Sequence, residues 1–351
     1  MMSSNAPWSI GYVPHGANLD RPMDRRRFPR YAAMRGLSFD LVSGWEGHEV
    51  IVLTPAADIT HWVDVAPDRR LVVDFPDAYL EEGPGLKRAV RGLAKWLSGE
   101  SRRPVLSYLR ALTRLLERAD AVVCSTDEQA TKIARYNHNV HPILDLHGEF
   151  GFLPATIRQS DRFDIVWEGL TATLPAIRQV LPALRALARS RQLRLHLVTD
   201  LEAPKYMNRF VVQRTEEMVA DWGIDVRLYQ WTIEKLTEVA GFCDLAIVPV
   251  DLTDPLAVGK PENRMRIFWR LGLPVVVSAN PAHIRAADLA GLGDHVVCST
   301  IEEWEKALVG LAARPALRLE VGSAGQAAAR SAYSEESLAL RWDRVIDSLQ
   351  R

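Results

Sequence analysis

The fold class follows from one stretch of the sequence, Lys260-Pro-Glu-Asn-Arg-Met-Arg-Ile-Phe-Trp-Arg-Leu-Gly-Leu-Pro-Val-Val-Val-Ser278. It predicts a helix with Pro261 at the first position, because the N–H that proline lacks would have no helical partner there. Gly272 suits the left-handed conformation that ends a helix. The apolar, β-branched run 273–277 is typical of a strand buried on both faces. The stretch therefore indicates an α/β fold.

The start of this predicted helix is a candidate anion site. The first N–H groups of a helix have no helical partner, and the helix dipole favours negative charge at this end. Lys260 and Arg264 add full positive charges close by. We therefore expect a phosphate-bearing ligand here.

The composition is that of a soluble globular protein. The chain has 351 residues, of which 48% are hydrophobic and 25% charged, and its net charge is −1. This length suits two domains. No apolar run reaches the ~18 residues of a membrane span, and the first residues lack the pattern of a secretion signal, so we expect a cytoplasmic protein. Cys124, Cys243 and Cys298 lie in or beside apolar runs and predict buried thiols in a reducing compartment.

One segment departs from the balanced charge of the chain. Between Leu86 and Arg118 only two acidic residues oppose nine basic ones, which are Lys87, Arg88, Arg91, Lys95, Arg102, Arg103, Arg110, Arg114 and Arg118. Apolar residues recur at helical spacing from Leu86 to Leu97. Two interpretations are open: a basic amphipathic helix in peripheral contact with an anionic membrane, or a solvated helix that packs one face on its own domain.

Two series of alternating strands and helices predict two doubly wound, Rossmann-like domains in an α/β fold. In the first series we expect strands at 9–14, 39–42, 50–54, 70–75, 121–125 and 139–146, with helices at 30–36, 86–118 and 127–136. In the second we expect strands at 163–167, 193–199, 225–229, 245–249, 273–277 and 296–298, with helices at 174–189, 208–222, 232–242, 301–311 and 335–349. The predicted domains are 1–150 and 151–331, with a linker at 148–161 and a C-terminal helix at 332–351 that crosses back to the first domain.

Five segments, in this order and spacing, resemble the GT-B-fold retaining glycosyltransferases that make bacterial polysaccharides and glycolipids (family-4 type). They are Ala119–Thr126, Asn139–His147, Ile165–Gly169, Asp244–Pro249 and Gly272–Val276. The resemblance implies that the second domain binds a nucleotide-diphosphate sugar and the first a glycan or glycolipid acceptor. It implies no metal ion, no cofactor and no nucleic acid.

The chain departs from the family at two places. The positions of the family's two glutamates hold Gly259 and Ile267, and Glu262 is the nearest carboxylate that could contact the donor ribose. The family also tends to carry a basic residue just after the first glycine turn of the donor domain, whereas this turn reads Gly169-Leu-Thr-Ala-Thr173. Asn263-Arg264 resembles the start of this helix in divergent members.

Candidate site residues follow from these positions. The expected catalytic set is Lys260, Arg264 and Glu262, in which the two cations stabilise the leaving diphosphate. The expected donor contacts are Gly169, Thr171, Thr173, Trp231, Pro261 and Asn263. The expected acceptor contacts, at the carboxyl ends of first-domain strands, are His15, Gly16, Asn18, Asp74 and Asp77. For several residues a structural role stays open: a packing tryptophan at Trp231, a plain loop at 15–18 and a helix cap at Asp74.

The favoured function is transfer of a sugar from a nucleotide-diphosphate sugar to a hydroxyl acceptor, with retention. The missing glutamate pair motivates an alternative, a non-catalytic GT-B-fold protein that binds or partners within a polysaccharide assembly. A sugar-nucleotide epimerase is a further option, for which the sequence shows no acid–base set. The residues leave open the base, the sugar, the acceptor, the linkage and the oligomeric state.

Overall fold

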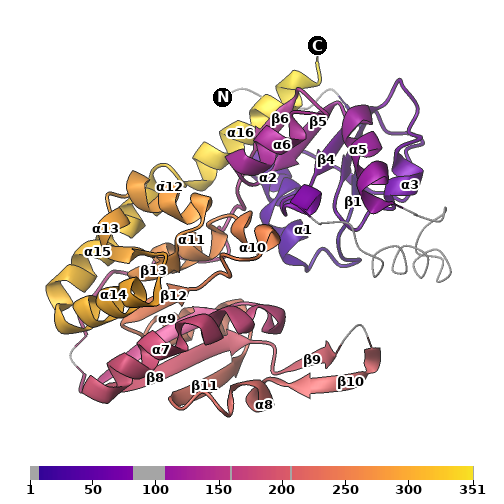
Figure 1. Cartoon of the computed structure of the whole chain (residues 1–351). Helices are drawn as coiled ribbons and strands as arrows, with labels where there is room; N and C mark the ends of the chain where they lie inside the picture. The colour runs from indigo at the N-terminus through magenta and orange to yellow at the C-terminus, as the bar shows by residue number, and fades with distance from the viewer. Residues whose placement is uncertain (1–7, 82–106, 159, 206–207, 351) are drawn as a thin grey trace. The chain divides into compact units, whose positions relative to one another are not determined.

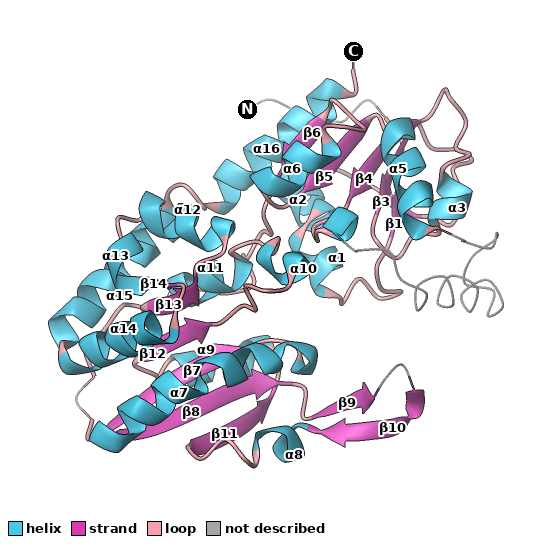
Figure 2. Cartoon of the chain, in the orientation of Figure 1, coloured by secondary structure: helices cyan, strands magenta, loops and turns pink. Residues whose placement is uncertain are grey.

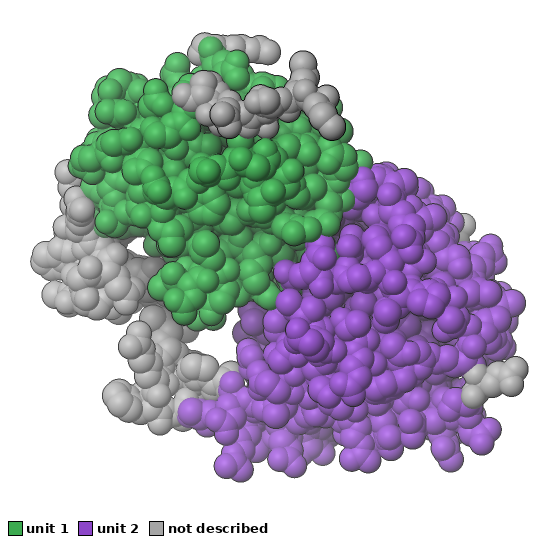
Figure 3. Space-filling view, turned by 180° about the vertical axis from the view of Figure 1, so that it is seen from behind, with its two compact units in different colours: residues 1–147, 259–261, 335–351 green, residues 148–258, 262–334 purple. Residues whose placement is uncertain are grey.

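The computed structural model describes residues 8–81, 107–158, 160–205 and 208–350. The chain divides into two compact units (Figure 3). The first holds residues 1–147, 259–261 and 335–351, and the second holds residues 148–258 and 262–334. The predicted division into domains 1–150 and 151–331, with a C-terminal helix at 332–351, stays a prediction. The expected helix from 86 to 106 lies outside the described residues.

The first unit is built on a parallel sheet in the order β2-β1-β3-β4-β5-β6. Its strands are β1 Ile10–Val13, β2 Asp40–Leu41, β3 Val50–Leu53, β4 Arg70–Asp74, β5 Ala121–Cys124 and β6 Val140–Pro142. Every residue of β1, β3 and β5 is buried, as the apolar runs predict. The helices are α1 Pro22–Arg26, α2 Phe28–Arg35, α3 Ile59–Trp62, η1 Tyr79–Glu81, α5 Tyr108–Arg118, α6 Asp127–Ile133 and α16 Glu335–Ser348.

The C-terminal helix α16 packs on α2 of the first unit. Trp342 stacks on Tyr31 with 5.6 Å between ring centroids. Arg35 donates to both carboxylate oxygens of Asp343, and Arg30 pairs with Glu335 at 2.9 Å. One aromatic stack and two ion pairs thus attach the end of the chain to the first unit.

The second unit is built on a parallel sheet in the order β11-β8-β7-β12-β13-β14. Its strands are β7 Arg162–Glu168, β8 Gln192–Thr199, β11 Asp225–Gln230, β12 Leu245–Val248, β13 Val275–Ser278 and β14 Val297–Cys298. Its helices, seen in Figure 1, are η2 Thr171–Thr173, α7 Pro175–Ser190, α8 Thr215–Val219, α9 Ile233–Ala240, α10 Pro255–Val258, α11 Asn263–Arg270, α12 Pro281–Leu289, α13 Gly293–Val296, α14 Ile301–Ala313 and α15 Pro315–Arg330. The strand order reverses between β7 and β12, which places a ligand crevice at the carboxyl ends of these strands.

The expected helix over 208–222 is wrong. Strands β9 Glu202–Lys205 and β10 Asn208–Arg214 form an antiparallel pair outside the six-stranded sheet (Figure 2), and only α8 is helical. The sequence carries Phe210, Val211 and Val212 in a row, and aromatic and β-branched residues favour strands. Residues 208–214 pair with β9, which lies a few residues earlier in the chain, and therefore form a strand although their pattern predicted a helix.

The helix of the stretch 260–278 begins later than expected. α11 starts at Asn263 with Glu262 as its N-cap residue, so Pro261 precedes the helix and does not occupy its first position. The predicted end is confirmed, because Gly272 has a φ of 74° and Leu273 N–H donates to Phe268 O, the pattern that closes a helix. Helix α15, which the sequence reading missed, packs on α11 where Gly325 faces the Trp269 ring.

Candidate functional site

The turn after β7 lies at the strand-order reversal of the second sheet. Gly169 follows the last residue of β7, and η2 then leads into α7. Leu174 is the N-cap residue of α7 and offers no side-chain hydrogen bond to the first N–H groups of that helix. The N–H groups of Leu174 and Ile177 already donate to the carbonyls of Thr171 and Leu174, and Pro175 has no N–H, so the start of α7 offers few free donors to an anion.

Arg264 of α11 covers this turn. Its Nη2 donates to Thr173 Oγ1 at 3.3 Å. A Cβ built on Gly169 would lie 2.9 Å from both Cζ and Nη1 of Arg264, so the guanidinium contacts the glycine backbone. The same guanidinium lies 5.7 Å from the centroid of the Trp167 ring. The turn lacks a basic residue of its own, and Arg264 supplies the positive charge from a distant part of the chain.

Glu168 connects Arg264 to Trp231, and the sequence analysis did not predict this residue as part of the site. Its carboxylate Oε2 accepts from the indole Nε1 of Trp231 at 3.0 Å, and Oε1 lies 3.8 Å from Nε of Arg264. The residue is 7% exposed. The signal in the sequence was a charged residue at the end of a strand. Glu168 is the last residue of β7, and the five residues before it are all buried.

The other expected donor residues separate into two groups. Trp231 follows β11 and reaches the cluster through Glu168. Thr171 is 4% exposed and donates its hydroxyl to the carbonyl of Asp200, so it serves the packing of the turn. Thr173 likewise donates its hydroxyl to the carbonyl of Leu170 at 2.8 Å, and it also accepts from Arg264. Gly169 and Trp231 stay predicted donor contacts, and Thr173 is connected to them through Arg264.

Residues at the start of α11 do not all face this turn. Glu262 is 5% exposed, and its Oε1 accepts from the hydroxyl of Tyr333 at 3.2 Å. Burial raises the pKa of Glu262 above its ordinary value. Asn263 Oδ1 accepts from Nη1 of Arg266 at 3.0 Å. Lys260 and Pro261 belong to the first unit, so their expected approach to Arg264 stays a prediction.

In the first unit, the turn after β1 is held by a buried carboxylate. Asp24, 1% exposed, accepts from the backbone N–H groups of His15 at 2.8 Å and Gly16 at 2.9 Å, and from the Tyr12 hydroxyl at 2.8 Å. The side chains of His15 and Asn18 are exposed. This turn offers side chains to a ligand, because the N–H groups of its first two residues are engaged.

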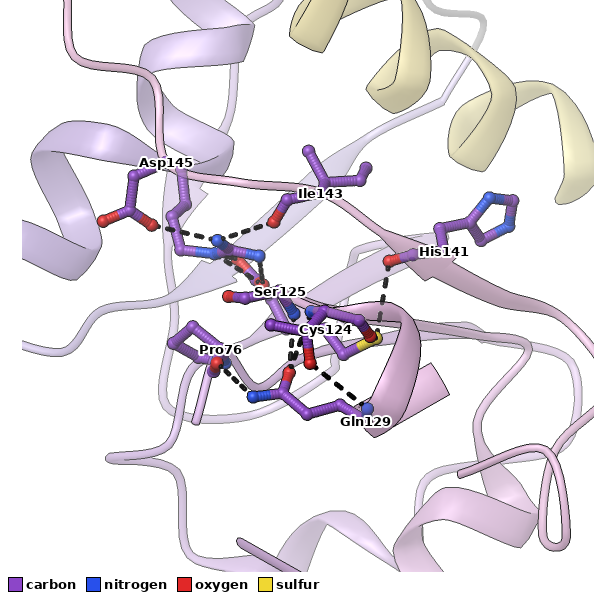
Figure 4. Close-up of polar contacts among 10 residues, drawn as sticks. Pro76, Cys124, Ser125, Gln129, His141, Ile143 and Asp145 are labelled. Atoms are coloured by element: carbon purple, nitrogen blue, oxygen red, sulfur yellow. Dashed lines mark hydrogen bonds and ion pairs between the residues drawn. The ribbon is translucent and has the colours of Figure 1, made fainter. Parts of the chain in front are cut away.

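Asp74 and Asp77 differ in their availability to a ligand. Asp74 is fully buried, and both of its oxygens accept from Nε of Arg27, at 2.8 and 2.9 Å. Arg27 in turn donates to Asp145 and to the carbonyl of Ile143, each at 3.0 Å (Figure 4). Asp77 is exposed at the end of β4. Asp77 therefore remains a candidate acceptor contact, and Asp74 is a structural residue of the first unit.

Gln129 attaches the segment 259–261 to the first unit. Its Nε2 donates to the carbonyl of Pro76 at 3.0 Å, and its Oε1 accepts from Ser125 N–H at 2.7 Å (Figure 4). Nε2 also donates to the carbonyl of Gly259 at 3.1 Å, and Oε1 accepts from Thr126 N–H at 3.3 Å. The two Nε2 bonds hold Pro76 and Gly259 to one side chain, and the two Oε1 bonds hold that side chain to the residues that precede α6. The segment that carries Lys260 is thereby fixed to the end of β4.

Several other features bear on the expected chemistry. Cys124, Cys243 and Cys298 are buried free thiols, as the sequence predicts, and burial raises the pKa of Cys124 and Cys298 to about 12. Within the described ranges, no three His, Cys, Asp or Glu side chains gather as a metal site would need. No helix in that part of the chain is both long and apolar enough to traverse a bilayer.

Comparisons by sequence find nothing: no family model and no curated protein matches the chain. Comparison by structure finds clear similarity at low identity. HepE from Anabaena, solved in complex with UDP, is 10% identical with a TM-score of 0.62, over 97% of this chain and 100% of that one. WaaG, a glycosyltransferase involved in lipopolysaccharide biosynthesis, is 13% identical with a TM-score of 0.54, over 94% and 98%.

TarM of S. aureus is 11% identical with a TM-score of 0.57 over 85% of this chain. This chain spans only 54% of the length of TarM. At such identities the similarity is informative about the fold. The two parallel six-stranded sheets with their helices have the GT-B fold of these neighbours, as the sequence resemblance predicted.

Proposed function

We propose that this protein is a glycosyltransferase that moves a sugar from a nucleotide-diphosphate sugar to a hydroxyl group of a glycan or glycolipid, with retention at the anomeric carbon. The observation that carries the proposal is the guanidinium of Arg264 over the Gly169 turn. The GT-B fold and a neighbour solved with UDP agree with it.

The second unit would bind the donor at the carboxyl end of β7. The terminal nitrogens of Arg264 would donate to the diphosphate at the Gly169 turn, while the Thr173 hydroxyl, which donates to the carbonyl of Leu170, would hold Arg264 in place as an acceptor. Trp231 would stack on the nucleobase, since aromatic rings accept any base on their π-face. Lys260 remains in the proposal as a second cation for the leaving group.

Sugar transfer needs charge stabilisation more than covalent help from the protein. The bond from the anomeric carbon to the diphosphate oxygen breaks, and a bond from the acceptor oxygen to that carbon forms. Negative charge grows on the departing diphosphate, where a positioned guanidinium lowers the barrier. The acceptor hydroxyl loses its proton, which the departing phosphate oxygen can accept. Retention is carried over from the family that the sequence resembles.

The first unit would contribute the acceptor contacts. His15 and Asn18 are exposed after β1, with the backbone of Gly16 between them, and Asp77 is exposed after β4. Exposed polar side chains at the carboxyl ends of parallel strands suit hydroxyl groups. WaaG acts in lipopolysaccharide biosynthesis, which supports an acceptor of the glycan or glycolipid class.

A second candidate function is non-catalytic nucleotide-sugar binding in a polysaccharide assembly. Ile267, which replaces one family glutamate, is 1% exposed in the core of the second unit. No carboxylate therefore occupies that position. In this second candidate function, the protein would bind the donor diphosphate without transferring the sugar.

The test begins with a thermal-shift screen of UDP, GDP, ADP and their sugars. Release of the labelled sugar, with and without glycan acceptors, is then measured for wild type, Arg264→Ala and Arg178→Ala. Arg178 is a matched control, because it is an exposed arginine of the same unit that pairs with Asp221. We expect turnover in wild type and Arg178→Ala and a large loss in Arg264→Ala. Binding without turnover would favour the second candidate, and no binding would contradict both.

A further inference from the structure

Glu168 contacts two side chains from different elements. The carboxylate ends β7, Trp231 follows β11, and Arg264 belongs to α11. One oxygen accepts the indole N–H at 3.0 Å, and the other lies 3.8 Å from Nε of the guanidinium. The Glu168 side chain is 9% exposed and the Arg264 side chain 25%. A nearly buried acid thus connects the two residues that the proposed function assigns to base and diphosphate.

We propose that Glu168 is a positioning residue that sets the orientation of Arg264 and Trp231 and so couples diphosphate recognition to base recognition. This inference rests on the proposed function and adds a residue to it. Glu168 itself would touch neither ligand group. It acts through the two side chains that it holds.

The orientation of the guanidinium supports this role. A guanidinium carries five N–H donors in a rigid planar fork, so fixing one edge fixes the others. Glu168 faces Nε, while Nη2 donates to Thr173 and Nη1 lies against the Gly169 backbone. The carboxylate therefore holds the inner edge and leaves the terminal edge over the turn, where a diphosphate would accept from it.

The distance between Glu168 and Arg264 suits a residue that orients its partner more than one that stabilises the fold. At 3.8 Å the Nε and Oε1 atoms attract without a hydrogen bond. An ion pair of this length, in which the Arg264 side chain is 25% exposed, contributes little to folding. The bond from Trp231 Nε1 to Glu168 Oε2 fixes the rotation of the indole ring, and a fixed ring is a better stacking surface because less freedom is lost on binding. Loss of Glu168 should therefore change binding more than it changes stability.

Three single variants and one double variant test the coupling. Glu168→Gln keeps an oxygen for the indole N–H and removes the charge that faces Arg264. Trp231→Phe keeps an aromatic ring and removes the N–H. Arg264→Ala removes the cation alone and in combination with Glu168→Gln. Calorimetry is run with inorganic diphosphate, with the tightest-binding of UDP, GDP and ADP, and with the matching nucleoside.

For Glu168→Gln we expect about tenfold weaker binding of inorganic diphosphate, with nucleoside affinity within twofold of wild type. For Trp231→Phe we expect the reverse pattern. The double variant should bind inorganic diphosphate no more weakly than Arg264→Ala, because Glu168 acts on that ligand through Arg264. These results support the inference, and the non-additivity is a readout that a merely structural role would not produce.

Two outcomes for the variants, and one for the wild type, overturn the inference. Tighter binding of inorganic diphosphate by Glu168→Gln would show that the carboxylate only repels the anion. Unchanged affinities with a lowered melting temperature would show a structural role. A wild-type protein that binds nucleoside diphosphate but transfers no sugar would contradict the enzymatic proposal while leaving the coupling intact. A wild-type protein that binds neither inorganic diphosphate nor any of the three nucleotides would overturn both.

Discussion

The first strands of the two sheets, β1 and β7, lead into turns of opposite charge. After β1, the buried carboxylate of Asp24 accepts the backbone N–H groups of His15 and Gly16. After β7, the guanidinium of Arg264 lies on Gly169 and donates to Thr173. Both strands adjoin the point where their sheet reverses order, so both turns are in the position where open α/β sheets bind ligands.

Two turns at equivalent positions thus present opposite charges, and we infer that the charge, more than the position, selects the ligand. A carboxylate that has taken the N–H donors leaves little for an anion, whereas a guanidinium that adds donors attracts one. In the proposed function the first turn would face acceptor hydroxyls and the second the donor diphosphate. The charge brought to each turn from elsewhere in the chain makes this division.

The largest expected effect is on the first turn. Asp24→Ala leaves the Tyr12 hydroxyl and two backbone N–H groups without their acceptor, which should cost about 3 kcal/mol of unfolding free energy. Urea unfolding followed by circular dichroism measures it. Tyr12→Phe removes one donor and should cost about 1 kcal/mol. A tenfold change in diphosphate affinity in Asp24→Ala would contradict the separation of the two turns.

The second effect is on diphosphate binding. Arg264→Ala should weaken binding of inorganic diphosphate by about 2 kcal/mol, roughly thirtyfold, the range of a charge-assisted hydrogen bond. Calorimetry at fixed ionic strength checks this, with Arg178→Ala as the control. Equal affinities for the two variants would remove the second turn from the donor site.

The third effect is a pH dependence of the second unit. Burial, with a smaller contribution from the charge of Arg264, lowers the pKa of His283 from 6.5 to about 4. Its Nδ1–H donates to the carbonyl of Ser278 at 2.9 Å. Because the unfolded state binds the proton more tightly, the stabilisation is complete above pH 6.5 and is lost as the pH falls toward 4. Between pH 7.5 and 5.5 the loss should be about 1 kcal/mol.

Urea unfolding across this range, compared with His283→Gln, isolates the contribution of His283. Arg264→Ala should make the acid dependence shallower, because removing a nearby positive charge raises the folded-state pKa toward 6.5. Asp24→Ala should leave the steepness unchanged. A wild-type curve as flat as that of His283→Gln would show that this histidine is protonated at little cost.

The smallest effect compares two glycines. A Cβ at Gly169, where φ is 156°, would lie 2.8 Å from the Trp167 ring and 2.9 Å from the Arg264 guanidinium, so Gly169→Ala should cost about 1 kcal/mol and reduce diphosphate affinity. At Gly16 the nearest atom is Cγ of Arg21, on a flexible side chain that can move aside. Gly16→Ala should stay within about 0.5 kcal/mol of wild type. Urea unfolding measures the free energy of unfolding of both variants, and calorimetry measures their affinity for inorganic diphosphate. Equal losses of stability in the two variants would contradict this prediction.

The sequence predicted the strands well, because a strand buried on both faces needs a continuous apolar run. The runs at β3, β5, β12 and β13 are buried over their whole length. The hairpin β9–β10 was misread, because a short run next to a helical pattern carries no local sign of its partner strand. Helix α15 was missed because Gly322 and Gly325 lower its helix propensity. Packing requires both glycines, because Gly325 lies against Trp269 of α11 and Gly322 lies against Gly272 O and Pro274.

The candidate site was predicted in its parts and not in its connections. Gly169, Thr173, Trp231 and Arg264 were all singled out, each as a separate contact at a strand or helix end. Glu168, which joins Trp231 to Arg264, and Asp24, which occupies the first turn, were not. Asp74 looked available, yet Arg27 occupies both of its oxygens. The sequence gives the chemical type of a polar side chain. Its hydrogen-bond partner is a residue far along the chain, which the sequence does not identify.

By itself, the sequence determined the two parallel α/β sheets and the glycine that ends α11, because burial patterns and left-handed turns are written in neighbouring residues. Only the tertiary structure decided which charge each turn receives. Strand β12 pairs with β7, and the chain after β12 carries α11, whose Arg264 reaches the Gly169 turn across the strand-order reversal. A hydrogen bond between segments so distant in sequence exists only when the sheet has brought them together, which is why Glu168 and Arg264 meet in the fold and not in the sequence.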